Sequence, residues 1–518
     1  MPTAVDLIAT VCLVWSSVVV VVEALGISAI FRYFSSKPNA PVSSTLGSNT
    51  PAVTIIRPVK GLEPHLYECI ASTFRQEYPL DKLQIRLCVE DKSDPAYPIL
   101  AQVVKDFPDF DAKVLVENED ANTTANLGPN PKIRNISRAY REANADIIWV
   151  VDCNVWVPKG VLGRMVDRLN GFKPGNRMVQ PYKFTHQMPL VVDIVDYAHD
   201  QLMDGQTLLS SASEASPQAD LATPQGSQGL ARILAQGGGR LDEMFMASTH
   251  AKFYGAINAV GVAPCVVGKS NMFRKSQLNM ATTPSENPIL ARDETRPPGV
   301  DFFSHNICED HSIGDILWRT DIPGFKNHGI VWGNIVVQPM AGMSVRAYAA
   351  RRVRWLRARK WTVLAATLVE PGVESMLCGL YFTFAVTNLP WFEENMGIPQ
   401  TWSAMGSLWL LFVTVWMLAD WAVFCRLHSA KSIEMDENTP YFAKGRSGPR
   451  AVTRRRFSEW VVAWIGRETM ALPIWTWAVL LGKTVNWRGR RFLVRSDTTV
   501  VEIEPKGSEA QGKKNRKD

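Results

Sequence analysis

Long apolar stretches stand near both ends of the chain, and the region between them alternates apolar and polar positions. Residues 7–30 are almost entirely apolar and are long enough to span the hydrocarbon of a bilayer. No Lys or Arg precedes Arg32, so the basic start of a signal peptide is missing. We therefore expect a retained N-terminal transmembrane anchor at 5–31 and two further spans at 375–392 and 401–424.

Charges beside these stretches indicate their orientation. Basic residues follow the first stretch, precede the second and follow the third, whereas the connector between the second and third carries Glu393 and Glu394 and no basic residue. Because basic flanks mark the cytosolic side, the polar middle is expected to face the cytosol. A last apolar stretch, 457–482, is interrupted by charges and by Pro473, which indicates a re-entrant or interfacial segment within a C-terminal membrane region at 370–485.

The middle of the chain, 50–360, alternates short apolar runs with helical patterns. The expected strands are 53–59, 83–91, 112–118 and 146–152, and the expected helices are 64–76, 97–107 and 130–144. Strands that alternate with helices predict an α/β domain with a mostly parallel sheet and helices on both faces. The Ser-, Ala- and Gln-rich segment at about 208–238 is expected to be a disordered insert, and 486–518 is expected to be a cytosolic tail.

Composition adds a membrane context and argues against two kinds of ligand. The mean hydropathy of −0.06 over 518 residues averages apolar ends with a polar middle. The eight cysteines are scattered singly, without a Cys-x-x-Cys pair, which argues against a zinc site and fits a reducing compartment. The net charge of +6 is concentrated beside the apolar stretches, where the lipid bilayer is the expected partner. No basic motif with interspersed aromatic residues indicates nucleic acid.

Two aspartates directly follow predicted strands. Asp91 in VEDKSDPA and Asp152 in VVDCNV are expected at the carboxyl ends of parallel strands, where open α/β sheets bind their ligands. Taken alone, each aspartate could simply begin a turn after a strand, but two at one sheet edge favour a nucleotide site. Residue 154 is Asn, so the chain lacks a literal Asp-x-Asp pair of metal-binding acids.

Two later segments carry further candidate chemistry. Asp310, which follows Glu309 in CEDHSIG, precedes a helical pattern and is either a helix cap or a general base. In RRVRW, helical spacing places Arg351, Arg354 and Trp355 on one face. Such a helix can hold lipid phosphates, but Arg354 could equally bind a diphosphate leaving group while Trp355 packs against an acceptor.

The three aspartates and RRVRW stand in the order D, D, D, (Q/R)xxRW of membrane-bound inverting glycosyltransferases, and the chain resembles the ceramide glucosyltransferase family. The similar segments extend from the anchor to about residue 495. In chain order they are RPVKG (57–61), CVEDKSDPA (88–96), NPKIRNI (130–136), VVDCNVWV (150–157), STHAKFY (248–254), CVVGKSNMFRK (265–275), CEDHSIG (308–314), RRVRW (351–355), and the late IGRETM and NWRGRRF. Their shared order carries the resemblance.

The resemblance implies a GT-A fold, a Rossmann-like domain that uses UDP-glucose and a divalent metal, Mg²⁺ or Mn²⁺. It implies that Asp91 contacts the uridine, that Asp152 binds the metal and the diphosphate, and that Asp310 is the catalytic base. The other residues that it associates with substrate binding are Lys60, Lys132, His250, Cys265, Arg351, Arg354 and Trp355. For His250 and Cys265, a satisfied polar histidine and a small buried thiol are equally good interpretations. With one protein carboxylate, the metal would complete its shell with diphosphate and water oxygens.

The implied reaction transfers glucose from UDP-glucose to the primary hydroxyl of ceramide with inversion, giving β-glucosylceramide and UDP. The implied setting is a multi-pass protein of the Golgi or ER–Golgi membrane, with its catalytic domain facing the cytosol. Two alternatives stay open. A processive polysaccharide synthase of the same fold would need more membrane helices, and a catalytically inactive lipid-binding scaffold would not need the three aspartates, Arg354 and Trp355.

Overall fold

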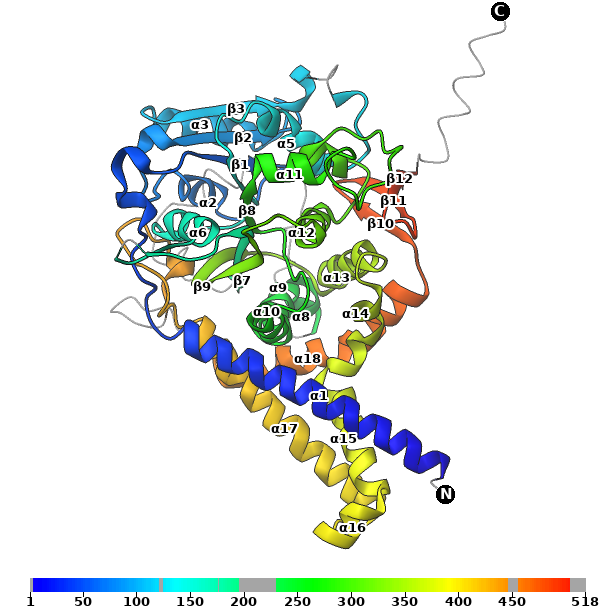
Figure 1. The fold of residues 1–518 in the computed structure, drawn as a ribbon. Helices are drawn as coiled ribbons and strands as arrows, with labels where there is room; N and C mark the ends of the chain where they lie inside the picture. The colour runs from blue at the N-terminus through cyan, green and yellow to red at the C-terminus, as the bar shows by residue number, and fades with distance from the viewer. Residues whose placement is uncertain (1–2, 121–123, 176, 195–229, 446–454, 504–518) are drawn as a thin grey trace, which may run out of the picture.

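The computed structural model describes residues 3–120, 124–175, 177–194, 230–445 and 455–503. Within them, the globular part is built around a seven-stranded sheet of order β3-β2-β1-β4-β8-β7-β9 (Figure 1). Its strands are β1 (Val53–Pro58), β2 (Leu83–Val89), β3 (Asp111–Val116), β4 (Ile147–Val151), β7 (Tyr182–Asp193), β8 (Ser270–Arg274) and β9 (Lys326–Met340). Neighbouring strands are parallel, except that β8 runs antiparallel to β4 and β7. The predicted mostly parallel sheet is therefore confirmed.

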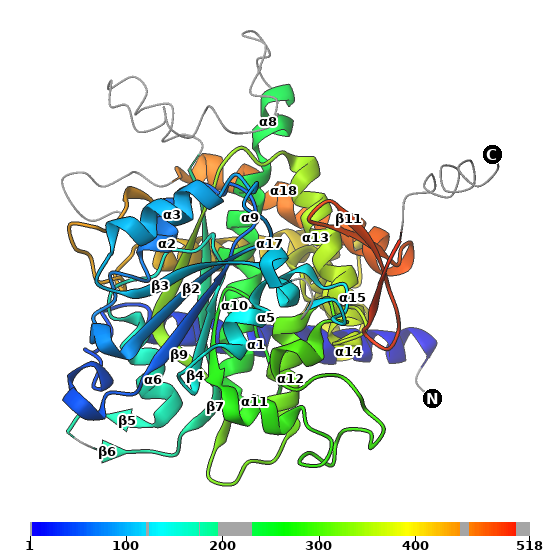
Figure 2. The same cartoon turned by 90° about the horizontal axis from the view of Figure 1, so that it is seen from above.

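The central strands are apolar on both faces because helices cover both faces (Figure 2). In β1, Ile55 belongs to one apolar core and its neighbour Ile56 to the other, as the two-residue period of a strand requires. The helices of the first core are α2 (Leu66–Ala71), α3 (Tyr97–Asp106) and α6 (Val161–Asn170), and those of the second are α5 (Pro131–Arg141), α11 (Lys275–Ala281) and α12 (Glu309–Arg319). The predicted strands and helices of this region are confirmed, with α2 shorter than expected.

Three helices leave the globular part on one side (Figure 1). They are α1 (Ala4–Tyr33), α15 (Ser375–Asn388) and α17 (Trp402–Leu427). Among the described residues, α1 and α17 are long and apolar enough to cross a membrane. The stretch predicted at 375–392 has a different form, because α15 has 14 residues and gives way to the short helix α16 (Pro390–Met396). Helix α15 packs against both α1 and α17. Its crossing of a membrane stays a prediction.

Further helices lie at the junction of the globular part and these three helices. They are α9 (Gly238–Ala247), α10 (Thr249–Val260), α13 (Val345–Arg359), α14 (Leu364–Val369) and α18 (Phe457–Trp475). In α18 the charged residues that interrupt the apolar pattern, Arg467 and Glu468, are buried, whereas large apolar residues such as Val462, Ile465 and Leu472 are exposed. Pro473 lies inside this helix, which continues as a π-helical turn at Thr476–Leu480.

Helices α1 and α10 approach each other closely at a glycine. A Cβ on Gly26 would lie 2.1 Å from the backbone oxygen of Lys252, so any larger residue there would collide with the α10 backbone. This close approach brings Glu23, the only charged residue within the apolar stretch 7–30, to the Lys252 side chain. Glu23, the charged residue that interrupts the predicted anchor, therefore forms a buried ion pair.

Two segments differ from their expected form. Residues 230–236 of the predicted insert form helix α8 (Leu230–Gln236), and residues 208–229 lie outside the described part of the chain. In place of the beginning of a tail, residues 484–502 form a three-stranded antiparallel sheet of β10 (Thr484–Trp487), β11 (Arg490–Val494) and β12 (Val500–Glu502). These strands are too short for their alternation to stand out among many arginines, and their apolar side chains are covered by residues distant in sequence.

Candidate active site

Asp152 lies at the end of β4, where two lysines hold its carboxylate. Its Oδ1 is 2.9 Å from Nζ of Lys132, and its Oδ2 is 3.2 Å from Nζ of Lys269. Lys269 immediately precedes β8, which pairs antiparallel with β4, so the start of β8 faces the end of β4. The Asp152 backbone N–H donates to the Lys269 carbonyl at 3.0 Å and joins the two segments. Sequence reasoning missed Lys269, because only the strand order brings it here.

The two lysines keep Asp152 ionised. Burial alone would raise the pKa of the Asp152 carboxyl, but the ammonium groups of Lys132 and Lys269 outweigh it and hold that pKa well below its usual value. The side chain remains 23 % exposed, so the carboxylate is still accessible to a ligand. The neighbouring Asn154 offers its Oδ1 to Lys269 at 3.1 Å. Its amide oxygen is therefore already engaged.

Lys132 also joins this strand end to the acids of α12. Asn130 caps α5 by accepting from the backbone N–H groups of Lys132 and Ile133, at 2.8 and 3.1 Å. In the first turn of that helix, Lys132 Nζ lies 3.1 Å from Glu309 Oε1. Glu309 was not predicted as a site residue, although it adjoins Asp310 in the sequence.

Asp310 lies in the first turn of α12, against the loop before β8. A Cβ on Gly268 would lie 2.8 Å from Asp310 Oδ2, so the glycine leaves the space that the carboxylate occupies. Burial raises the pKa of the Asp310 carboxyl, and the nearby positive charge of Lys132 offsets this only in part. A raised pKa makes this carboxylate a better proton acceptor than an exposed aspartate.

Asp91 occupies a more open position at the same sheet edge. It follows β2 and accepts from the Ser93 N–H at 2.7 Å and from Asn118 Nδ2 at 2.6 Å, and these hydrogen bonds lower the pKa of its carboxyl. A polar cavity of about 450 Å³ lies beside it, lined by Glu90, Glu117, Asn118, Pro131, Arg134 and Arg490. Lys60, which the resemblance also associates with substrate binding, pairs with Glu90 at 2.7 Å and Asp94 at 3.7 Å.

The predicted arginine helix forms, but its side chains divide between two roles. Arg351 lies 3.3 Å from Asp242 of α9, and its guanidinium stacks 4.5 Å from the Trp355 ring, so it already has partners. Arg354 forms no ion pair with any residue that the structure describes. Burial, together with the positive charges of Arg351 and Arg488, lowers the pKa of Arg354 to about 10. An uncompensated guanidinium of this kind favours an anionic ligand.

His250 lies in the first turn of α10 (Thr249–Val260), and Cys265 lies in the segment between α10 and β8. The His250 ring stacks against Tyr254 at 5.4 Å and lies 5.6 Å from Phe245, which in turn lies 6.5 Å from Trp355. Burial lowers the pKa of His250 to about 3 and raises that of the Cys265 thiol to about 12, so both groups are neutral. The ring contacts connect His250 to Trp355 through Phe245.

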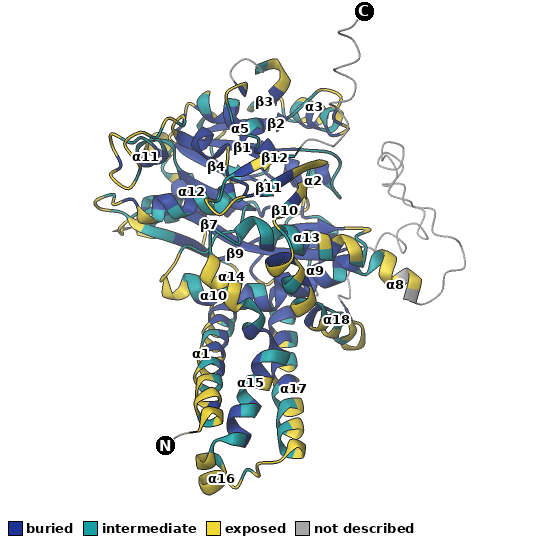
Figure 3. Ribbon diagram, turned by 90° about the vertical axis from the view of Figure 1, so that its right-hand side faces the viewer, coloured by how far each residue is buried: buried dark blue, intermediate teal, exposed yellow. Residues whose placement is uncertain are grey.

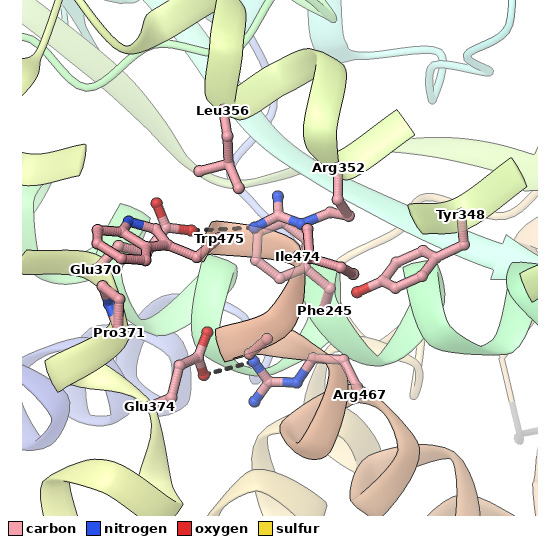
Figure 4. Close-up of a pocket in the computed structure, with 11 residues that line it drawn as sticks. Phe245, Tyr348, Arg352, Leu356, Glu370, Pro371, Glu374, Arg467, Ile474 and Trp475 are labelled. Carbon is pink, nitrogen blue, oxygen red and sulfur yellow. Dashed lines mark hydrogen bonds and ion pairs between the residues drawn. The ribbon is translucent and has the colours of Figure 1, made fainter. Parts of the chain in front are cut away.

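A second cavity lies farther toward the apolar helices, between α13 and α18 (Figure 4). Its charges face each other in pairs. Arg352 donates to Glu370 at 3.1 Å, and Arg467 donates to Glu374 at 2.5 Å. Because these charges are already paired, we interpret this cavity as part of the packing interface between α13 and α18.

Comparison with known proteins identifies the family. The profile of glycosyl transferase family 21 matches residues 8–193 and 295–500. A ceramide glucosyltransferase of Gibberella zeae is 54 % identical over 505 residues, 97 % of this chain and 95 % of that protein. A ceramide glucosyltransferase of Pyricularia oryzae is 52 % identical over 523 residues, 99 % and 98 % of the two chains. Among solved structures, a mannosyltransferase of Pyrobaculum calidifontis in complex with GDP-Man and Mn²⁺ covers 82 % of this chain and 98 % of its own, at 14 % identity and a TM-score of 0.40. Since the profile and both relatives match most of its length, the chain belongs to glycosyl transferase family 21 and groups with the ceramide glucosyltransferases.

Proposed function

We propose that this protein transfers glucose from UDP-glucose to the primary hydroxyl of ceramide, with inversion at the anomeric carbon and release of UDP. The observation that carries the proposal is the 54 % identity to a ceramide glucosyltransferase over 97 % of the chain. Lys132 pairs with both Asp152 and Glu309, and Asp310 adjoins Glu309. The proposed metal-binding carboxylate and the proposed base therefore lie around one lysine. We assign these residues to a GT-A catalytic domain at 50–360.

In this mechanism Asp310 is the general base. As the ceramide oxygen attacks the anomeric carbon, its proton passes to the Asp310 carboxylate. The new C–O bond forms on the face opposite the breaking bond to the diphosphate, so an α-linked donor gives a β-linked product in one displacement. Negative charge grows on the leaving UDP. Arg354 is the cation without an ion pair among the described residues, and Lys132 and Lys269 lie beside Asp152 at the same strand end. The polar cavity beside Asp91 is the proposed nucleoside site.

Asp152 is the residue that we assign to a divalent metal, Mg²⁺ or Mn²⁺. In the described part of the chain, no three His, Cys, Asp or Glu side chains are grouped as a metal cage. The single carboxylate fits a hard cation whose other ligands are diphosphate and water oxygens, a shell that Mg²⁺ accepts readily. When bound, the metal would neutralise diphosphate charge as a Lewis acid.

Asp152→Asn is expected to lower kcat/KM for UDP-glucose by about 10²–10³-fold, because it removes the carboxylate charge that would hold the metal. The measurement is activity against Mg²⁺ or Mn²⁺ concentration, and the variant should need more metal. Asn154→Ala is the matched control, since that amide oxygen already binds Lys269, and it should stay within a few fold of the parent. Equal metal dependence in Asp152→Asn and the parent would contradict the assignment.

The pH profile of kcat/KM is expected to show an acid limb above the usual aspartate pKa of 3.8, because burial raises the pKa of Asp310. A base with a raised pKa is ionised above that pKa and becomes protonated as pH falls through it, so activity declines on the acid side. In Asp310→Asn the residual activity should lack this limb. The same limb in parent and variant would show that another group titrates.

The membrane setting is supported by the apolar surface of the long helices. Their outward faces expose large side chains, as the exposed stretches of α1 and α17 in Figure 3 show. The exposed residues include Leu7, Ile8, Val11, Val14 and Val18 of α1 and Leu410, Leu411, Val415 and Leu418 of α17. Such a continuous apolar surface suits lipid better than water. We propose a membrane anchor at 5–31 and a C-terminal membrane region at 370–485 that includes α15, with α18 lying in the interface through its exposed apolar side chains.

We further propose that the catalytic domain faces the cytosol and that the protein resides in the Golgi or ER–Golgi membrane. The basic residues that flank the long helices on the side of the globular part support the orientation. The Golgi assignment rests on the family. Protease digestion of sealed microsomes should cleave the globular part from outside and spare α16. Protection of the globular part would reverse the orientation.

The direct test uses full-length protein purified in detergent, with UDP-glucose, ceramide and Mg²⁺ or Mn²⁺. We expect UDP release in equal amount to glucosylceramide, and no comparable product from GDP-mannose. A growing sugar polymer would instead indicate a processive synthase. Ligand binding without turnover would indicate a lipid-binding scaffold.

A further inference from the structure

We propose that Arg488 binds the diphosphate of the sugar-nucleotide donor, so that the C-terminal sheet β10–β12 completes the donor site. This inference rests on the proposed function, and it gives a binding role to a residue of the late segment NWRGRRF, none of whose residues the sequence predicted as a site residue. It is carried by the placement of the sheet, by the backbone at Arg488, and by the lack of an ion pair for its guanidinium among the described residues, where it lies 5.8 Å from the centre of the Trp487 ring.

The C-terminal sheet is attached to the segment that leads into α12 (Figures 1 and 3). The Val500 N–H donates to the His305 carbonyl at 2.8 Å, and Asn306 Nδ2 donates to Thr498 Oγ1 at 2.9 Å. Ile307, three residues before Asp310, packs in one core with the apolar side chains of the sheet, which are Val485, Phe492, Val494 and Val500. The sheet is therefore fixed next to the helix that carries the proposed base.

The β10–β11 turn lies near the two proposed parts of the donor site, the nucleoside cavity beside Asp91 and the guanidinium of Arg354. Arg490, the residue after the β10–β11 turn, lines the polar cavity beside Asp91 and is held by Glu502 through two hydrogen bonds of 2.7 and 2.5 Å. Arg488, in the turn itself, lies close enough to Arg354 and Glu117 to perturb the ionisation of both. The turn thus lies between the proposed nucleoside cavity and the arginine of α13.

The backbone at Arg488 is unusual for its side chain. Trp487 pairs with Arg490, so Arg488 and Gly489 are the two central residues of a tight hairpin, with φ of 51° and 79°. Turns with positive φ at both central residues prefer Asn, Asp or Gly at the first position. Holding an arginine in the left-handed region costs conformational free energy, and backbone strain of this kind clusters at functional sites.

The Arg488 guanidinium is available for an anion. Its Nη1 is buried and has no hydrogen-bond partner among the described residues, and the side chain forms no ion pair with them. Arg354 is likewise without an ion pair in the described ranges, so two guanidinium groups that repel each other share one region. Both side chains are half-buried, and like charges partly withdrawn from water are unfavourable together unless an anion joins them. A diphosphate, which carries two negative charges and many acceptor oxygens, matches a pair of arginines.

The test compares Arg488→Asn with Arg491→Ala in full-length protein purified in detergent. Asn tolerates the left-handed backbone, so the hairpin should remain and only the guanidinium is lost. Arg491 lies on the same strand, is exposed, and loses the same charge. The probes are UDP and uridine, each competed against a fluorescent UDP analogue in the presence of Mg²⁺, and thermal unfolding is followed in parallel.

For Arg488→Asn we expect the Kd of UDP to rise 10- to 100-fold, the Kd of uridine to stay within twofold, and the unfolding temperature to stay unchanged. Arg488→Lys should recover part of the UDP affinity, and Arg491→Ala should match the parent. A UDP Kd within twofold of the parent in Arg488→Asn would overturn the inference, as would an equal loss for UDP and uridine. If the parent itself binds neither UDP nor UDP-glucose, the proposed function fails as well, which separates the two outcomes.

Discussion

Asp310→Asn is expected to lower kcat by about 10²–10⁴-fold while the Kd of UDP stays within a few fold. The amide keeps the shape of the side chain and its place against Gly268, but it cannot accept the proton of the ceramide hydroxyl. The loss should therefore fall on the chemical step. The measurement is single-turnover formation of glucosylceramide, together with equilibrium binding of UDP.

Asp315→Asn is the control for this experiment. Asp315 lies on the same helix, α12, and forms a partly exposed ion pair with Arg319 four residues later. Exposed pairs of this kind contribute little, so both kcat and UDP binding should stay within about twofold of the parent. Full turnover in Asp310→Asn would remove Asp310 from the role of base. A large rise in the Kd of UDP with unchanged single-turnover rate would assign it to donor binding instead.

Lys252→Met is expected to destabilise the folded protein by about 3–5 kcal/mol, the usual cost of removing one partner from a buried ion pair. Lys252 lies between Glu23 of α1 and Asp420 of α17, with Nζ 2.6 Å from Asp420 Oδ1, and all three side chains are almost fully buried. Without the ammonium group, two carboxylates face each other away from water. Thermal unfolding and inactivation in detergent measure the effect.

A neutralised network provides the check on this explanation. In the triple variant Lys252→Met, Glu23→Gln and Asp420→Asn, the uncompensated charges are gone, and much of the lost stability should return. Lys113→Met, on an exposed position of β3, should change stability by less than about 0.5 kcal/mol. If Lys252→Met unfolds like the parent, the buried charges do not hold α1 and α17 to α10.

The position of the two aspartates at one sheet edge was predictable because its signals in the sequence are local. Asp91 and Asp152 each follow an apolar strand, and parallel strands bring such ends to one edge, as β2 and β4 do on either side of β1. The N-cap at Asn130 was equally local, since a cap and a proline begin the helix within two residues. Lys269 and Glu23 have no such signal. Their partners lie 117 and 229 residues away, and only packing selects them.

The roles within the basic helix also depended on packing. Helical spacing placed Arg351, Arg354 and Trp355 on one face, but it could not tell which arginine has an acid partner. Asp242 pairs with Arg351, and no described acid pairs with Arg354, so their availability to a ligand differs. The short strands around Arg488 were missed for a related reason, since their apolar side chains are covered by Ile307 from another part of the chain.

By itself, the sequence determined the α/β alternation, the long apolar helices and the acids at the strand ends, because hydrophobic period and chain order encode these features directly. The tertiary structure decided which charges are paired and which remain available, and it brought the C-terminal sheet to the site. Electrostatic pairing depends on distance in space, and a fold joins residues that are hundreds of positions apart. Which side chains meet at the site therefore follows from packing, whereas the strands and helices that carry them follow from the local sequence pattern.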